Sequence, residues 1–430
     1  MSGSESSTAW RQIIIVELLL PDMNNLLKFP DKFLWGTSTS AHQVEGNNHN
    51  QWSEWEKENA ERLAKEAKNY WQSWQQEKFP EMFSSKNYIS GRACDHYNRY
   101  EEDFNLVKVM NNNAHRFSIE WSRIEPEEGK FNEKEIEHYR QVIWALKKRG
   151  IEPFVTLWHW TIPLWFVEKG GFEKRENIKY FVRFCERIAS EFKNDVKFWI
   201  VLNEPEIYTA LSYLKGTWPP QKKNFFSYLK VLKNLIRTHR SVFEAIKQID
   251  NQAQVGIAKN NIYFEGRLSP IIKWWWNFYF LNHIKNYQDF IGLNYYFHNR
   301  IKGLKFNQNE NEKTSDLGWE IYPKGIYCVL KELKKYQKPI YITENGLADV
   351  KDEKREKFIK EHLYWIHKAI QEGVDVRGYF YWSLLDNFEW DKGFWPRFGL
   401  VEIDYQTLER KIRPSAQEYA KICKNNELMT

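Results

Sequence analysis

Cysteine is scarce in this chain, and its four cysteines lie far apart. Cys94, Cys185, Cys328 and Cys423 form no Cys-x-x-Cys pair within the 430 residues. Disulfide-stabilised small domains and zinc ribbons both depend on closely spaced cysteines, so the sequence indicates neither. The pattern favours a reducing compartment, and we expect a cytoplasmic protein.

The chain also lacks a long block of one charge. Its 63 basic and 57 acidic residues are interleaved, and the formal net charge is +6. Interleaved charge is typical of a solvated surface, whereas nucleic-acid binding usually needs a clustered basic patch. We therefore expect no nucleic-acid partner.

No apolar run near the N-terminus is long enough to cross a membrane. The run at 13–20 is interrupted by Glu17, and Arg11 is the only basic residue before it. A bilayer span needs about 20 apolar residues, and a signal peptide needs a basic start and a small-residue cleavage site. We interpret residues 1–25 as an N-terminal extension, with a secretory signal as the less favoured alternative, and we expect no membrane partner.

Aromatic side chains are abundant. They make up 17% of the chain, which includes 21 Trp residues. A Trp ring buries a large apolar area and can also stack on the C–H face of a sugar ring. We expect most of these rings in the core and a minority around a site.

Eight short runs rich in β-branched and aromatic residues predict strands. Amphipathic stretches of helical period separate most of them, as at 133–148, 175–192, 225–249 and 355–371. Strands that alternate with helices form parallel sheets, and eight such units predict one α/β domain, a (β/α)8 TIM barrel over residues 26–425 with insertions at its rim. The predicted strands are 33–37, 114–119, 153–157, 197–202, 255–258, 290–293, 339–343 and 376–382.

Two segments depart from this regular pattern. Residues 47–92 form a long, charged insertion after the first strand, which we interpret as a helical flap on the barrel or, less favoured, as a wall of the site. Residues 274–280 are apolar on all sides. They predict a buried helix rather than an exposed functional patch, although an auxiliary ligand there is left open.

Two glutamates stand at the ends of predicted strands. Glu204 follows the fourth strand and Glu344 follows the seventh. The C-terminal ends of the strands carry the active site in TIM barrels, so both carboxylates are expected at one rim. A carboxylate after a buried strand is costly to desolvate unless it has partners or a catalytic task, and two together suit acid–base and nucleophilic work.

The segments around these glutamates resemble the family 1 glycoside hydrolases, the β-glucosidase group. The most specific motifs are Asn-Glu-Pro at 203–205 and Thr-Glu-Asn-Gly at 343–346, and the resemblance runs from Phe33 to about Ala416. The other matching segments are 33–38, 43–46, 116–123, 156–160, 289–296, 382–390 and 397–400.

The resemblance implies a retaining β-glycosidase that hydrolyses terminal, non-reducing β-D-glucosyl residues, and also galactosyl and fucosyl residues. Glu344 would be the nucleophile that forms a covalent glycosyl-enzyme, and Glu204 the acid/base. The two carboxyl groups of a retaining enzyme lie about 5 Å apart. Arg116, Asn294 and Tyr296 would support Glu344 in its charged form, and that charge would keep Glu204 protonated.

Further matched positions would bind the sugar, and no metal or other cofactor is implied. Glu389 would also repel a phosphate, so the resemblance favours unphosphorylated sugars. The implied sugar-binding residues are Gln43, His159 and Glu389 for the 3-, 4- and 6-hydroxyls, Asn203 for the 2-hydroxyl, Trp382 for stacking, and Trp160, Trp390 and Phe398 for the wall. Trp319 is expected on the leaving-group side.

The chain departs from the family pattern between the fifth and sixth strands, where the segment from Asn261 to Asp289 is short. A shortened wall leaves open a sugar-binding protein with an impaired catalytic site. A metal-dependent barrel hydrolase is a third interpretation. It is disfavoured because the histidines have no obvious ligand spacing; these are His42, His96, His115 and His159.

Overall fold

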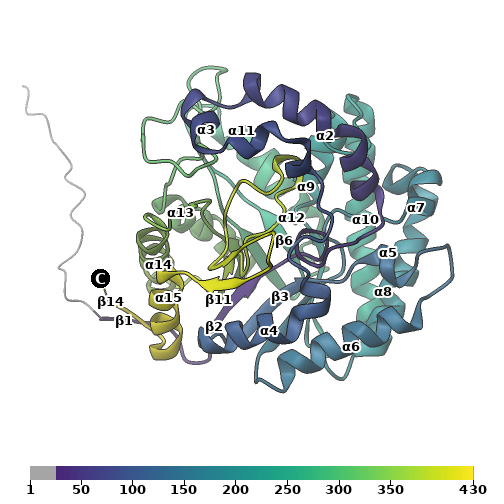
Figure 1. Cartoon of the computed structure of the whole chain (residues 1–430). Helices are drawn as coiled ribbons and strands as arrows, with labels where there is room; N and C mark the ends of the chain where they lie inside the picture. The colour runs from purple at the N-terminus through teal and green to yellow at the C-terminus, as the bar shows by residue number, and fades with distance from the viewer. Residues whose placement is uncertain (1–25, 430) are drawn as a thin grey trace, which may run out of the picture.

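The structure is a computed structural model that describes residues 26–429, so the predicted extension at 1–25 lies outside the described residues. Eight parallel strands close into a barrel in the order β10-β11-β2-β3-β4-β5-β6-β8 (Figure 1). Each predicted strand overlaps one of them, and the TIM barrel fold is confirmed. The strands are β2 (Leu34–Ser38), β3 (Ala114–Ser118), β4 (Glu152–Thr156), β5 (Phe198–Asn203), β6 (Gln254–Asn260), β8 (Phe290–Asn294), β10 (Ile340–Asn345) and β11 (Val376–Trp382).

Helices surround the barrel, and two of them begin after an Asn residue whose side chain caps the first turn. The side chain of Asn132 accepts a hydrogen bond from the backbone N–H of Lys134 at the start of α6, and Asn224 does the same for Ser227 at α10. The predicted helix at 175–192 begins at Ile178 instead, because a 3₁₀ turn occupies 175–177. The surrounding helices are α4 (His96–Val109), α6 (Glu133–Lys147), α8 (Ile178–Phe192), α10 (Phe225–Ile249), α12 (Tyr279–Ile284), α13 (Lys324–Leu333), α14 (Arg355–Gln371) and α15 (Pro414–Asn425).

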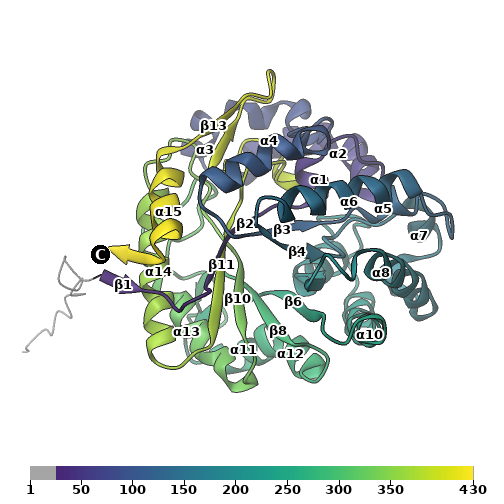
Figure 2. The same cartoon turned by 90° about the horizontal axis from the view of Figure 1, so that it is seen from below.

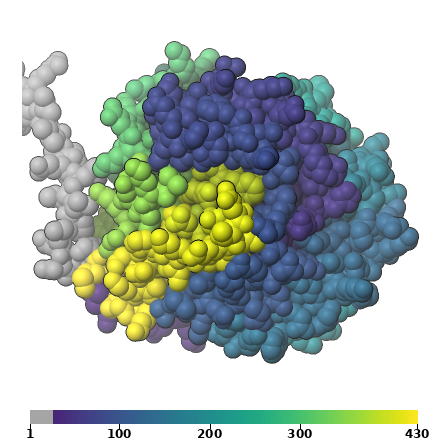
Figure 3. Space-filling model, in the orientation of Figure 1, coloured from purple at the N-terminus to yellow at the C-terminus, as the bar shows by residue number. Residues whose placement is uncertain are grey.

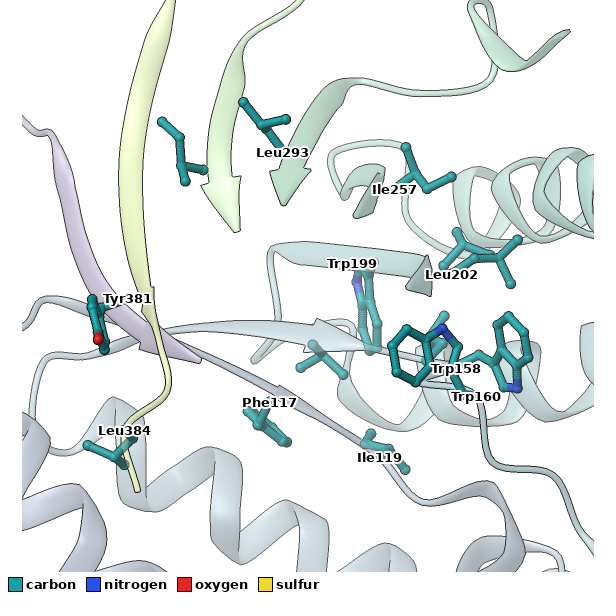
Figure 4. Close-up of a cluster of buried hydrophobic side chains, with 14 of the residues drawn as sticks. Phe117, Ile119, Trp158, Trp160, Trp199, Leu202, Ile257, Leu293, Tyr381 and Leu384 are labelled. Carbon is teal, nitrogen blue, oxygen red and sulfur yellow. The ribbon is translucent and has the colours of Figure 1, made fainter. Parts of the chain in front are cut away.

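Apolar side chains fill the barrel from inside and outside, because successive strand residues point to opposite faces. On β5, Phe198 and Ile200 belong to the interior cluster, whereas Trp199 packs outside. Inside, the rings of Phe154 and Phe198 stack with centroids 4.1 Å apart. Figure 4 shows part of the outer cluster, with Trp199 on the strand β5. The interior cluster leaves the C-terminal ends of the strands to polar side chains.

Short elements complete the chain. Strand β1 (Leu26–Lys28) pairs with β14 (Glu427–Met429), so the two ends of the described chain lie side by side (Figure 2). Two more small sheets pair β7 (Tyr263–Glu265) with β9 (His298–Arg300), and β12 (Val401–Ile403) with β13 (Arg410–Ile412). The short helices are α1 (Ala41–Val44), α5 (Trp121–Ile124), α7 (Leu164–Glu168), α9 (Pro205–Thr209) and α11 (Ser269–Lys273).

The insertion at 47–92 is helical, as predicted. It contains α2 (Gln51–Tyr70) and α3 (Ser73–Lys78), and it lies against the C-terminal part of the chain (Figure 3). Asn87 accepts hydrogen bonds from the backbone of Phe394 and Trp395. The insertion also reaches the rim, because Gln51 donates to the carbonyl of Trp160 at 2.8 Å.

The aromatic segment at 274–280 is only partly buried, so the prediction of a buried helix is wrong for its first turn. A π-helical turn (Trp274–Phe278) joins α11 to α12. Trp274 is 51% exposed, whereas Phe280 is buried. A run that is apolar on every side does not predict which of its faces packs against the core. The wide π-helical turn leaves one face exposed to solvent. Among the helices of residues 26–429, none is long and apolar enough to cross a membrane.

Candidate active site

The two strand-end glutamates lie at the same end of the barrel. Glu204 follows β5 directly, and Glu344 is the second-last residue of β10. On one side, only β6 and β8 separate these two strands in the barrel. Each glutamate is buried and keeps 5% exposure. The strand order therefore brings polar residues of β6 and β8 between the two carboxyl groups.

Glu344 is bound by a cation and a phenol. Arg116 Nη1 lies 2.5 Å from Glu344 Oε1, and the hydroxyl of Tyr296 donates to Oε2 at 2.9 Å. Burial raises the pKa of Glu344, and the charge and hydrogen bond of Arg116 oppose that rise. The backbone nearby is tight, because a Cβ on Gly346 would lie 1.7 Å from the carbonyl oxygen of Trp382. Only glycine allows this approach at the end of the Thr-Glu-Asn-Gly motif.

Glu204 is bound by two amides and, among residues 26–429, forms no ion pair with a cation. Its Oε1 accepts from Asn294 Nδ2 at 2.8 Å and from Asn260 Nδ2 at 3.2 Å. Burial, followed by the nearby charge of Glu344, raises the pKa of Glu204 to about 8. Glu204 has a positive φ of 41° and precedes α9, so its backbone is held in a left-handed conformation that is costly for this residue type.

Asn203 links the groups around both glutamates. Its Oδ1 accepts from Arg116 Nη2 at 2.7 Å and from Asn294 Nδ2 at 3.2 Å. Its Nδ2 lies 3.1 Å from His159 Nε2. Burial, followed by the charge of Arg116, lowers the pKa of His159 well below its usual value, so the ring is neutral. Nε2 of this neutral ring can then accept the amide hydrogen of Asn203.

A third carboxyl group, that of Glu389, lies at the rim. Glu389 Oε2 accepts from Gln43 Nε2 at 3.2 Å and from Asn387 Nδ2 at 2.9 Å. Burial raises the pKa of Glu389 to about 8. Ser40 donates to Gln43 Oε1 at 2.6 Å and fixes the orientation of the amide. Gln43 and Glu389 are thus oriented before any ligand is present.

Aromatic rings surround these polar groups. The ring of His159 stacks on Trp382 and on Trp390, with centroids 6.0 and 5.9 Å away. Trp160 packs on Trp390 at 4.9 Å, and each has a positive φ. Phe398 packs in one cluster with Trp382. These rings give the polar residues apolar walls of the kind that sugar rings stack on.

The structure brings all of the predicted site residues to one end of the barrel, and it adds two residues that the sequence interpretation missed. Asn260 contacts Glu204, and Asn387 contacts Glu389. Asn260 is the last residue of β6, so its place at a strand end was an available signal. Trp319 lies with its ring 6.0 Å from that of Phe398 and 5.9 Å from that of Tyr296.

The other histidines have local partners. His42 contacts Glu56 and His96 contacts Asp103, both at 2.7 Å, and His115 Nδ1 lies 3.0 Å from the hydroxyl of Thr37. Within residues 26–429, no group of three or more His, Cys, Asp and Glu side chains has an arrangement that could hold a metal ion.

Known proteins resemble this chain over almost its whole length. The family described as Glycosyl hydrolase family 1 matches residues 26–267 and 279–428. Beta-glucosidase A of Thermotoga maritima is 34% identical, over 94% of this chain and 99% of the relative. A beta-galactosidase of Saccharolobus solfataricus is 30% identical over 77% of this chain and 84% of its own length.

A solved structure is similar as well. The beta-glycosidase from Pyrococcus horikoshii superimposes with a TM-score of 0.83 at 40% identity, over 94% of this chain and 97% of that protein. Sequence and structure therefore agree, and the chain belongs to glycosyl hydrolase family 1, a family of retaining β-glycosidases.

Proposed function

We propose that this glycosidase removes terminal, non-reducing β-D-glucosyl residues, and also galactosyl and fucosyl residues, with Glu344 as nucleophile and Glu204 as acid/base. The observation that carries the proposal is the unequal environment of the two carboxyl groups. Glu344 has the guanidinium of Arg116 at 2.5 Å, whereas Glu204 has only neutral amide donors. A cation favours the charged form of an acid, so the two groups are suited to different tasks.

The first step forms the glycosyl-enzyme. The carboxylate of Glu344 attacks the anomeric carbon of the sugar while the protonated Glu204 gives its proton to the departing glycosidic oxygen. Arg116 and Tyr296 hold the attacking carboxylate in place. The raised pKa of Glu204, about 8, keeps its proton available near neutral pH.

The second step releases the sugar. The ester at Glu344 carries no charge. The part of the rise in the pKa of Glu204 that came from the charge of Glu344 is therefore removed, and Glu204 becomes a stronger acid. Its carboxylate then takes a proton from water, which attacks the same carbon from the opposite side to the ester. Two inversions at one carbon retain the anomeric configuration.

Sugar recognition rests on the second group of polar residues. Gln43, Glu389 and His159 provide donors and acceptors for the outer hydroxyls, and Asn203 provides them for the 2-hydroxyl. Trp382 offers a stacking face, and Trp160, Trp390 and Phe398 form the wall. Above its pKa of about 8, Glu389 is charged and repels a phosphate on the sugar. Gln43 and Glu389 share a hydrogen bond. This arrangement is consistent with an enzyme that accepts both the equatorial 4-hydroxyl of glucose and the axial 4-hydroxyl of galactose.

A panel of aryl β-glycosides tests this proposal. Glucoside, galactoside, fucoside and 6-phosphoglucoside substrates are compared by kcat/KM, and the first-formed anomer is followed by NMR. We expect the glucoside to be hydrolysed efficiently and the 6-phosphoglucoside to be a poor substrate. Efficient hydrolysis of the phosphorylated sugar alone would overturn the substrate assignment.

The cytoplasmic location is also a proposal. It rests on the cysteine pattern, and the structure leaves all four thiols, Cys94, Cys185, Cys328 and Cys423, without a disulfide.

A further inference from the structure

A buried ion pair lies directly behind the proposed acid/base residue. Lys259 Nζ contacts Glu206 Oε1 at 2.7 Å, and neither side chain is more than 4% exposed. Glu206 belongs to α9, the short helix that begins after Glu204, and Lys259 is on β6. Removing two charges from water is costly, and such a pair rarely adds stability over an apolar one. Its position therefore calls for a role other than stability.

Both members of the ion pair also form hydrogen bonds with backbone groups. Lys259 Nζ also donates to the carbonyl oxygens of Asn260 at 2.6 Å and Trp276 at 2.9 Å, so its three hydrogens all have acceptors. Glu206 Oε1 accepts a second hydrogen bond from the backbone N–H of Asn260 at 2.9 Å. Glu206 Oε2 is buried without a hydrogen-bond partner in the structure. All three hydrogens of the Lys259 ammonium group are therefore bonded, whereas only one of the two carboxylate oxygens of Glu206 has a partner.

Both partners are joined to Glu204 by short routes. Asn260, whose backbone is held by the pair, donates through its side chain to Glu204 Oε1 at 3.2 Å. Glu206 and Glu204 are two residues apart, and the backbone N–H of Glu204 donates to Ala258, the neighbour of Lys259, at 2.8 Å. The pair is thus linked to Glu204 through the helix α9 and through the strand β6.

The third acceptor of Lys259 lies in the segment between β6 and β8. Trp276 is in the π-helical turn, within the stretch 268–278 that the family match leaves out. The side chain of Asn277 in the same turn accepts from the backbone N–H of Ile262 and donates to its carbonyl, at 3.1 and 2.9 Å. The short segment between β6 and β8 is therefore tied to the ion pair rather than packed loosely on the rim.

We propose that Glu206 and Lys259 are positioning residues that hold Asn260 against Glu204 and set the proton affinity of that acid/base through their charges. The inference rests on the proposed role of Glu204. Glu206 is an anion near Glu204 and favours its protonated form, and Lys259 is a cation that offsets this effect. The charge of Glu206 is among the causes that raise the pKa of Glu204.

Other charged or titratable groups also face this region, and the experiment leaves them unchanged. Glu344 faces Glu204 from β10, Tyr296 from the end of β8, and Tyr228 faces Glu206 from α10. Substitutions at the pair alter the charge next to Glu204 while Glu344 and its partners stay in place.

The test is the alkaline limb of kcat/KM for an alkyl β-glucoside, whose leaving group needs the proton of Glu204. Glu206→Gln keeps the shape and the acceptor oxygen but removes the anion, and it leaves Lys259 uncompensated. We expect the limb to move to lower pH by about one unit. In the double variant Glu206→Gln/Lys259→Met the limb should return toward the wild-type position.

Two controls separate this role from a structural one. A dinitrophenyl glucoside needs no proton on its leaving group, so its alkaline limb should not follow the shift in Glu206→Gln. Glu332→Gln removes the carboxylate of another Lys–Glu pair, with Lys273 at 2.6 Å between α13 and α11, and should leave both limbs unchanged.

Loss of rate or of thermal stability in Glu206→Gln without a shift of the alkyl-glucoside limb would overturn the inference. If Glu206→Gln does not fold, Lys259→Met replaces it with the opposite expectation, a limb at higher pH, and an unmoved limb overturns the inference equally. An inactive wild-type enzyme would instead contradict the proposed function, so the two failures are distinguishable.

Discussion

Arg116 Nη1 lies 2.5 Å from Glu344 Oε1, and the guanidinium that makes this contact has no exposure to solvent. A buried cation this close to a carboxylate favours its charged form strongly, because little water screens the pair. Arg116 also donates to the hydroxyl of Thr156, to Asn203 Oδ1 and to the backbone carbonyl of Thr343. The arginine therefore holds Glu344, the proposed nucleophile, and the side-chain amide of Asn203 in one fixed arrangement.

Replacing Arg116 should impair catalysis and move the acidic limb of the pH profile. In Arg116→Gln, Glu344 loses its cation and its pKa rises, so it becomes protonated and inactive at a higher pH than in the wild type. We expect kcat to fall about 10²- to 10³-fold and the acidic limb of kcat/KM to move to higher pH. Arg123→Gln, which removes the pair with Glu45 at 2.9 Å, is the control and should leave that limb in place.

Removing the carboxyl group of Glu204, the proposed acid/base, should make the rate depend on the leaving group. In Glu204→Ala, kcat/KM for an alkyl glucoside should fall about 10³-fold or more, because the alkoxide must leave without a proton. For a dinitrophenyl glucoside the fall should be under about tenfold, since dinitrophenolate leaves unaided. Azide should then restore turnover and yield β-glucosyl azide. An equal loss for both substrates would contradict the assignment.

The role of Glu389 can be tested with substrates that each lack one hydroxyl group. Two substrates are compared with the glucoside in the wild type, a 6-deoxyglucoside and a 4-deoxyglucoside. For at least one of them, kcat/KM should be lower by about tenfold or more. In Glu389→Ala that preference should shrink, because the partner of the missing hydroxyl is already absent. The preference over a 2-deoxyglucoside should persist, because the proposed partner of the 2-hydroxyl is Asn203. A deoxy-sugar preference unchanged in both cases would place Glu389 outside the sugar contacts.

The buried carboxyl groups should make folding stability depend on pH. Burial raises the pKa of Glu389 from 4.5 to about 8, so the folded protein holds a proton that the unfolded chain releases. The stabilising contribution is complete below pH 4.5 and is lost as the pH rises toward 8. In Glu389→Gln this loss should be absent, so Tm should fall less between pH 5 and 8.5, by the equivalent of a few kcal/mol. Curves of Tm against pH that run parallel in the wild type and in Glu389→Gln would contradict this prediction.

The strands and the grouping of the site residues were predictable from the sequence for a physical reason. Buried parallel strands need continuous apolar runs, and the polar residue that ends each run lies at the C-terminal rim of a barrel. Glu204 and Glu344 both satisfy this pattern. Their neighbours were less predictable, because contacts such as Asn260 to Glu204 depend on which strands lie between β5 and β10.

The aromatic segment shows where sequence patterns give too little information. Apolar residues on every side of 274–280 predicted burial, but Trp274 is half exposed and the carbonyl of Trp276 binds Lys259. Neither the width of the π-helical turn nor a backbone acceptor is encoded in apolar periodicity. The buried Lys259 within the apolar strand β6 was the one available signal, since a lysine there needs a partner.

Covalent trapping of the nucleophile tests the central claim most directly. The enzyme is incubated with dinitrophenyl 2-deoxy-2-fluoro-β-glucoside, whose fluorine slows both steps while the good leaving group still allows the ester to form. Peptide mass spectrometry then locates the sugar. We predict one fluoroglucosyl group per chain, on Glu344, with matching loss of activity. A label on any other residue, or inactivation without a label, would contradict the account.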